Sequence, residues 1–178
     1  HQHFKLIDVF SALENILLGL PSSLDPKEVR SKVEEICNKY GFELNLDAKV
    51  YDMSVSEKQT LEIVKTLYRG AEVLILDEPT AVLTPQETRK LFNVIKNMRD
   101  DGKAVVIITH KLNEVLEVSD RVTILRKGEY VGTVDTKDAT EQLLTEMMVG
   151  QKVELNINRD LIEHKEKRLE VAHLTVTN

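Results

Sequence analysis

Apolar residues recur at helical spacing through the first part of the chain. An apolar stripe from Leu13 to Leu20 follows Ser11-Ala-Leu-Glu14, which has the pattern of a capping box. A second helix is predicted from Asp25-Pro26, a capping residue followed by proline at the first helical position, to Gly41. The pattern from Phe4 to about Tyr51 therefore predicts a small helical subdomain.

From Met53 onward, helical patterns alternate with short, continuous apolar runs of the kind expected for strands buried on both faces. Such an alternation indicates an α/β domain with a largely parallel sheet. The predicted elements are a helix from about Ser56 to Tyr68, a strand from Val73 to Leu76, a helix from Thr84 to about Met98, a strand from Ala104 to Thr109, a short helix from Lys111 to Val118, a hairpin of Arg121 to Leu125 and Glu129 to Val134, and a helix from Thr140 to Val149.

Residues able to do chemistry follow both buried strands. Asp77 and Glu78 end the first strand, and His110 ends the second. The carboxyl ends of parallel strands are where ligands bind in open sheets. One carboxylate there suits Mg²⁺, the next can orient or deprotonate a water, and an imidazole can donate to a terminal phosphate. The alternative is that the acids only end a strand before Pro79 and that the histidine is structural.

The segment Met53-Ser-Val-Ser-Glu-Lys-Gln59 precedes a helix. Backbone N–H groups and the dipole at a helix start favour anions, and the serine hydroxyls add donors. Taken alone, an ordinary serine-rich helix cap explains this segment better.

Composition narrows the possible partners. The formal net charge of −6 gives no sign of a nucleic-acid surface, which would be basic. Cys37 is the only cysteine, so an intrachain disulfide and a cysteine metal cluster are excluded. No apolar run is long enough to cross a bilayer, so we expect any link to a membrane to come through a partner.

Together, these segments resemble the nucleotide-binding domain of ABC transporters. His1-Gln-His-Phe4 resembles the Q-loop, Met53 to Gln59 the signature sequence, Val73 to Pro79 the Walker B strand, Thr80 to Thr84 the D-loop, and Ile107 to His110 the switch-histidine loop. The five segments stand in the family's order and at its spacing. The resemblance implies a P-loop NTPase-like α/β fold, here a partial parallel sheet with an inserted helical subdomain.

The resemblance also implies a role for each matching residue, with ATP and Mg²⁺ as cofactors. Glu78 and His110 would be catalytic, Glu78 by polarising water and His110 by contacting the γ-phosphate. Asp77 would hold Mg²⁺, and Gln2 would touch the metal region and report the nucleotide state to the helical subdomain. Ser54, Ser56 and Gln59 would bind nucleotide, Ser54 on the γ-phosphate held by an opposing cassette.

Within the family, the His1 to Phe4 segment and the run from Asp77 to Glu87 most resemble importers of nucleosides and simple sugars, which often carry two cassettes in one chain. The implied partners are membrane permease subunits, a second cassette in the same chain or a dimer, and indirectly a solute-binding protein. The implied location is the cytoplasmic face of the membrane.

The resemblance also implies a division into domains. Residues 1–150 are expected to be the C-terminal two-thirds of a first cassette, with a helical subdomain at about 5–52 and an α/β core at about 53–150. A linker (151–167) and the start of a second cassette (168–178) are expected to follow.

Two departures from the family bear on activity. The phosphate-binding loop G-x-x-x-x-G-K-[ST] does not occur in the 178 residues, so we expect this chain by itself neither to bind ATP tightly nor to hydrolyse it. Ser56 stands where the family usually has glycine, which allows close backbone approach to phosphate. We also expect an incomplete sheet with open edges to promote self-association.

Two other functions fit parts of the sequence. One is a soluble ABC-type ATPase that acts on ribosomes or DNA. The other is a non-catalytic interaction module whose motifs no longer act. The length and helicity of the segment from Phe4 to Tyr51 favour transport, and the presence of Glu78 and His110 argues against the module.

Overall fold

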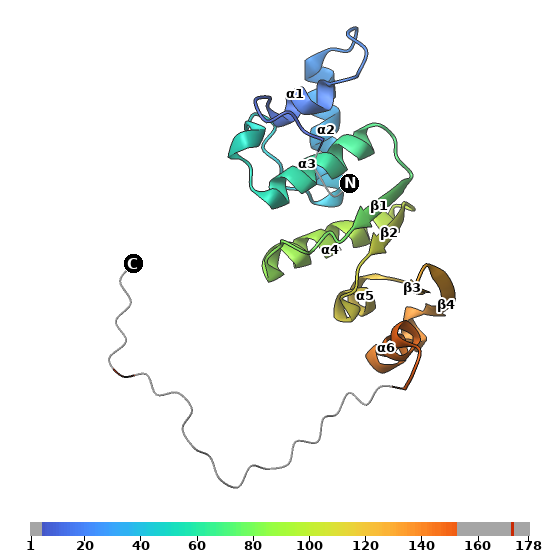
Figure 1. The fold of residues 1–178 in the computed structure, drawn as a ribbon. Helices are drawn as coiled ribbons and strands as arrows, with labels where there is room; N and C mark the ends of the chain where they lie inside the picture. The colour runs from blue at the N-terminus through green and yellow to red at the C-terminus, as the bar shows by residue number, and fades with distance from the viewer. Residues whose placement is uncertain (1–4, 153–171, 173–178) are drawn as a thin grey trace.

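The computed structural model describes residues 5–152 and residue 172. Three groups of elements follow one another from one end of this part to the other (Figure 1). A helical group comes first, two parallel strands with a long helix lie in the middle, and a hairpin between two short helices lies at the far end. The bounds are α1 Ala12–Leu17, α2 Pro26–Tyr40, η1 Val50–Asp52, α3 Val55–Tyr68, β1 Val73–Asp77, α4 Pro85–Asp100, β2 Ala104–Ile108, α5 Leu112–Val118, β3 Arg121–Arg126, β4 Glu129–Asp135, η2 Thr136–Asp138 and α6 Glu141–Val149.

The helix starts follow the capping signals in the sequence. Ser11 and Thr84 form the expected capping boxes at α1 and α4, and Asp25 caps α2 ahead of Pro26. Gly41 ends α2 in the left-handed conformation, at φ 83°. These local predictions are confirmed.

The predicted helical subdomain also contains a non-helical segment, residues 42–49, which crosses the start of α1 as irregular chain with a turn near Asp47. Ala12 N–H donates to Ala48 O and Leu13 N–H to Leu46 O, each at 3.0 Å. These bonds satisfy donors that the first turn of a helix leaves free. Pairing with α1 therefore takes the place of helix formation in this segment.

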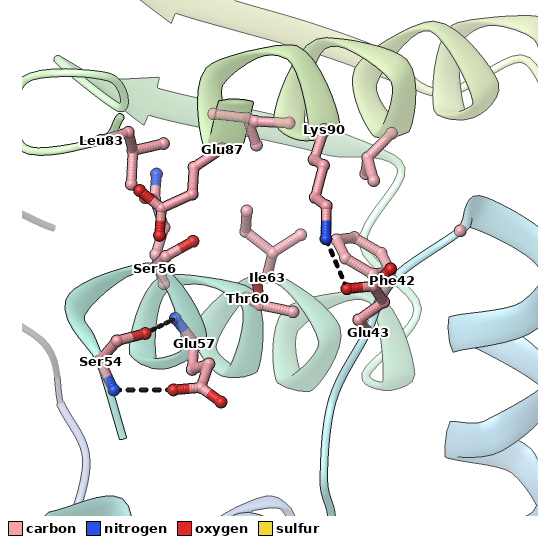
Figure 2. A pocket seen from close by; sticks show the side chains of 14 residues that line it. Phe42, Glu43, Ser54, Ser56, Glu57, Thr60, Ile63, Leu83, Glu87 and Lys90 are labelled. Atoms are coloured by element: carbon pink, nitrogen blue, oxygen red, sulfur yellow. Dashed lines mark hydrogen bonds and ion pairs between the residues drawn. The ribbon is translucent and has the colours of Figure 1, made fainter. Parts of the chain in front are cut away.

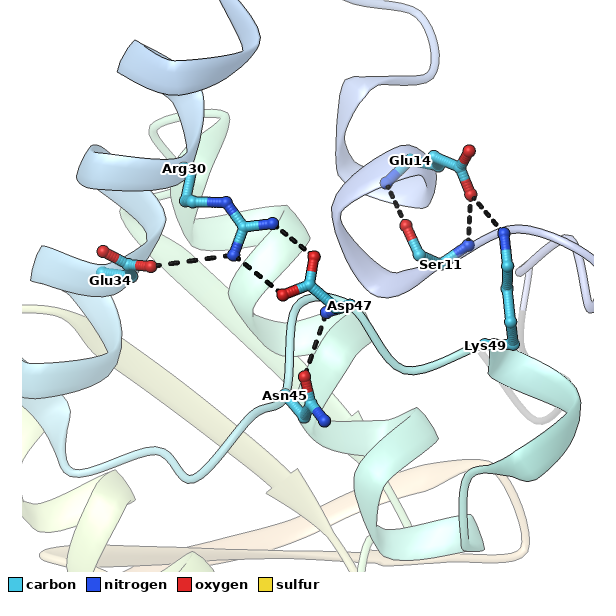
Figure 3. A network of polar contacts seen from close by, with 7 residues as sticks. All are labelled: Ser11, Glu14, Arg30, Glu34, Asn45, Asp47 and Lys49. Carbon is cyan, nitrogen blue, oxygen red and sulfur yellow. Dashed lines mark hydrogen bonds and ion pairs between the residues drawn. The ribbon is translucent and has the colours of Figure 1, made fainter.

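Polar contacts hold the same segment at its surface (Figure 3). The guanidinium of Arg30 on α2 donates to both carboxylate oxygens of Asp47, at 2.5 and 3.3 Å. Lys49 Nζ lies 3.0 Å from Glu14 Oε2, which also accepts from the Ser11 backbone. Exposed ion pairs are each worth only ~0.2–1 kcal/mol, so the apolar core below contributes more to holding the segment.

Helix α3 contributes to two apolar cores. Leu61 and Val64 pack into the helical group, with residues such as Ile16. Ile63 and Leu67 pack into a second core with β1, α4 and α5, where Phe92 is nearly fully buried. The helix that begins at the signature segment thus joins the helical group to the sheet.

The strands form two separate pairs. β1 and β2 are parallel, with Val73 opposite Ala104 and Asp77 opposite Ile108. β3 and β4 form the predicted antiparallel hairpin, turning at Lys127 and Gly128, which both have positive φ. Glycine at the second position favours this two-residue turn.

The prediction that β1 and β2 are buried on both faces is wrong in this structure. Leu74 and Leu76 are buried against α4, but Val73 and Ile75 on the other face are 57% and 61% exposed. Val106 and Ile108 on β2 are about half exposed. The reason is that the described residues cover the sheet from one side only.

Candidate functional site

Glu78 lies directly after β1 in an unusual backbone conformation. Its φ is 45°, the left-handed region that residues with a Cβ rarely occupy. Its N–H donates to Ile108 O at 2.8 Å, which continues the ladder between β1 and β2 by one bond. The chain then turns through Pro79 and Thr80, so the Glu78 side chain leaves the sheet at its carboxyl edge.

The structure brings Glu78 and His110 together. His110 Nδ1 lies 2.8 Å from Glu78 Oε1. The imidazole is 73% exposed and the carboxylate 36% exposed, so the pair lies at the surface of the sheet edge. The other carboxylate oxygen, Oε2, is buried and has no hydrogen-bond partner among residues 5–152. Glu78 therefore has one oxygen engaged by the imidazole and a second that is buried and unpartnered among the described residues.

Asp77 is the last residue of β1 and pairs in register with Ile108, two residues before His110. Its side chain is exposed. An exposed carboxylate offers the oxygen donors that Mg²⁺ prefers. Within the described residues, no group of three or more His, Cys, Asp or Glu side chains could hold a metal ion. The metal role of Asp77 stays a prediction.

The signature segment starts α3 with a capping box. Ser54 N–H donates to Glu57 Oε2 at 2.8 Å, and Glu57 N–H donates to Ser54 Oγ at 3.3 Å. The ordinary cap considered for this segment is therefore present. Ser54 is exposed at the helix start, where its remaining hydrogen-bonding capacity points outward.

A pocket lies between the start of α3 and the start of α4 (Figure 2). Ser54, Ser56 and Gln59 line it on the α3 side, and Glu87 and Lys90 line it on the α4 side. Hydrogen bonds from the backbone N–H and the hydroxyl of Thr84 hold the pKa of Glu87 below its ordinary value, and the Ser56 hydroxyl adds a smaller effect in the same direction. Ser56, at the position where the family usually has glycine, therefore lies across the pocket from the cap of α4.

Gln59 connects the signature segment to the carboxylate pair. Its Nε2 donates to Pro79 O at 3.0 Å, and Pro79 directly follows Glu78. Of the other residues proposed from the sequence, Ser54 and Ser56 lie on the pocket rather than against Glu78 or His110. Gln2 lies outside the described residues.

Three residues that were not predicted as site residues form a cluster on the segments that carry this pair. Thr80 is 1% exposed, and its hydroxyl and carbonyl both accept from Lys111 Nζ at 3.1 Å. The same hydroxyl donates to Glu114 Oε2 at 2.5 Å. Two sequence signals pointed there: Thr80 begins the segment that resembles the D-loop, and Lys111 directly follows His110.

Among the described helices, none is long and apolar enough to cross a membrane.

Comparisons with known proteins show the family of this chain. Residues 1–81 match the family model described as ABC transporter. The chain is 43% identical over 99% of its length to the nucleoside import ATP-binding protein NupA of Lactococcus lactis, and covers 36% of that protein. It is 39% identical over its full length to the glucose import ATP-binding protein TsgD13 of Haloferax volcanii, and covers 38% of it.

A solved structure has the same fold. The ATP-binding cassette MJ0796, in a dimeric post-hydrolysis state bound to ADP and Pi, superposes with a TM-score of 0.63 and 25% identity. The alignment covers 76% of this chain and 61% of that one. The chain spans somewhat more than a third of the length of the two curated relatives above. On these matches, the chain belongs to the ABC transporter family and carries part of the fold of its ATP-binding cassette.

Proposed function

We propose that this chain is part of an ATP-hydrolysing subunit that drives import of a simple sugar or a nucleoside. The observation that carries the proposal is the contact between Glu78 and His110 at the carboxyl edge of two parallel strands. The functions of the two relatives, nucleoside import and glucose import, support a role in transport over a role on ribosomes or DNA.

Each residue at the sheet edge has a task that its position allows. The Glu78 carboxylate, which is partly exposed, accepts a proton from, or orients, a water that attacks the terminal phosphate, a role worth ~10²–10⁴-fold in rate. His110 is held through Nδ1, so its other nitrogen is available to a γ-phosphate oxygen. Asp77 would hold Mg²⁺, which would neutralise phosphate charge. Gln2 acts near the same metal.

The signature residues act on a second nucleotide. Ser54 is exposed at a helix start, where backbone donors and a hydroxyl suit a phosphate. We assign Ser54, Ser56 and Gln59 to nucleotide bound by an opposing cassette. The dimeric state of MJ0796 with ADP and Pi supports such an arrangement.

The same proposal includes the domain plan and the partners. Residues 1–150 belong to one cassette, with 5–52 as the subdomain that docks onto permease subunits at the cytoplasmic face of the membrane and 53–150 as the α/β core. A solute-binding protein delivers the solute to the permease. The linker at 151–167 and the second cassette from 168 lie almost entirely outside the described residues.

The test uses a full-length protein that contains these residues. Glu78→Gln removes the proton-accepting oxygen while keeping the shape, so turnover should fall by ~10²–10⁴-fold with ATP binding retained. Turnover is measured by phosphate release and binding by calorimetry. Glu129→Gln, at an exposed position on β4, is the control and should have no effect. Unchanged turnover in Glu78→Gln would remove Glu78 from its role.

A further inference from the structure

The left-handed backbone of Glu78 requires neighbours that hold it. Such a conformation persists in a residue with a Cβ only when the surrounding structure enforces it. Ile108 O holds the N–H of Glu78, and Gln59 holds the carbonyl of Pro79. The next residue, Thr80, is one of two polar residues that are buried in the described structure, the other being Asn15 in the helical group.

Thr80 is held by a charge pair from the loop and helix that follow β2. Lys111 Nζ donates to the carbonyl and the hydroxyl of Thr80, and the hydroxyl donates onward to Glu114. Lys111 and Glu114 also contact each other at 3.2 Å, with Glu114 only 12% exposed. The Thr80 hydroxyl therefore donates one hydrogen bond and accepts another, and a buried network of this kind favours one geometry.

This cluster joins the two chain segments that carry the carboxylate–imidazole pair. Thr80 follows Glu78 by two residues, and Lys111 follows His110 by one. The His110 ring is mostly exposed, and its side chain contacts Glu78. Packing around the ring therefore contributes little to the position of the imidazole. The cluster, in contrast, links the two chain segments that carry Glu78 and His110.

We propose that Thr80, Lys111 and Glu114 are positioning residues that set Glu78 against His110. The contact between Glu78 and His110 can be observed without ATP hydrolysis. Its importance for hydrolysis rests on the function proposed above. Loss of either polar partner of Thr80 lets the turn after β1 and the start of α5 separate, which moves the carboxylate away from the imidazole.

The first test needs no nucleotide and uses the chain as it is. The ¹⁵N signal of His110 Nδ1 is recorded by NMR, with Glu78→Gln as the reference for a lost contact and His110→Gln for assignment. Glu114→Gln and Thr80→Val should each move the signal most of the way to the Glu78→Gln position. Thr80→Ser, which keeps the hydroxyl, should leave it in place. Glu117→Gln, the same change at an exposed site on α5, should leave it in place too.

Two results would overturn the proposal. One is a signal that stays in place in Glu114→Gln while Glu78→Gln moves it. The other is no movement in Glu78→Gln itself, because there would then be no contact to position. Since Thr80→Val buries a methyl beside two charges, Glu114→Gln decides the outcome if that variant does not fold.

The second test is a double-mutant cycle in the full-length protein. Glu114→Gln should lower kcat about tenfold with little change in KM for ATP, and should have almost no further effect in a His110→Ala background. An equal loss in both backgrounds would mean a general structural role and would overturn positioning. If the unaltered protein does not hydrolyse ATP, the proposed function fails, while the NMR signal still decides whether the cluster positions the pair.

Discussion

The backbone of Glu78 is left-handed at φ 45°, although a glutamate side chain makes that conformation costly. The same residue has a buried, unpartnered carboxylate oxygen among residues 5–152. Strain and an unsatisfied polar atom at one position are typical of residues kept for chemistry rather than for stability. At the scale of the residue, the backbone conformation and the unpartnered oxygen of Glu78 therefore both lower the stability of the fold, as expected for a residue with the role proposed above.

Glu78→Gly tests this conflict. Glycine adopts positive φ without steric cost, so we expect the free energy of unfolding to stay the same or to rise by up to about 1 kcal/mol. Glu78→Val, which is β-branched, should lower it by more than ~1 kcal/mol. Both are measured by urea unfolding of the chain. A similar loss of stability in the two variants would show that the backbone at Glu78 is not under strain.

At the scale of the elements, the helix starts combine local signals with tertiary contacts. The capping box of α4 satisfies donors of its own first turn through Thr84 and Glu87. Ser56 from α3 lines the same pocket and also lowers the pKa of Glu87. The charge of Glu87 therefore stabilises the start of α4.

The lowered pKa of Glu87 predicts a specific dependence on pH. A carboxyl whose pKa is depressed in the folded state stabilises the fold above its ordinary pKa, and this contribution disappears as the pH falls through the folded value. The unaltered chain should therefore be more stable than Glu87→Gln at neutral pH, and the difference should shrink below about pH 4. Urea unfolding at several pH values measures it, with Glu129→Gln as the control. A difference that does not vary with pH would contradict the assignment.

The two faces of β1 should respond differently to truncation. Leu76→Ala removes a buried side chain from the core over α4 and should cost ~2–5 kcal/mol of unfolding free energy. Ile75→Ala, one residue away on the exposed face, should cost less than about 1 kcal/mol. Chemical denaturation of the chain compares them. Equal costs would mean that the outer face of the strand is covered in solution.

At the scale of the whole molecule, the most unusual feature is an apolar sheet surface that the described residues leave open. Val73, Ile75, Val106 and Ile108 are all about half exposed or more. The parallel pair has only two strands, so each strand is also an edge with free backbone groups. Both features favour association between copies.

We therefore expect the chain to associate as its concentration rises, as measured by sedimentation velocity. The double change Ile75→Lys and Val106→Lys should weaken association by placing charges on the open face. Leu125→Lys, at an equally exposed apolar position on the hairpin, should not. A chain that stays monomeric at all concentrations would rule out this expectation.

Local order along the chain was predictable from the sequence, since caps, turns and helical periodicity act between residues that are close in the chain. The starts of α1, α2 and α4, the hairpin turn at Lys127 and Gly128, and the position of Asp77, Glu78 and His110 at strand ends all follow from such short-range signals. The roles of these three residues stay predictions.

Tertiary structure decided which surfaces are covered and which distant residues meet. Residues 42–49 lie across the start of α1 because its free backbone donors offer partners, and β1 is half exposed because the described chain covers one face. Thr80 and Glu114 are 34 positions apart and meet only because β1 and β2 lie side by side. Burial and long-range hydrogen bonding depend on neighbours that no local pattern specifies, so the cluster beside Glu78 became visible only in three dimensions.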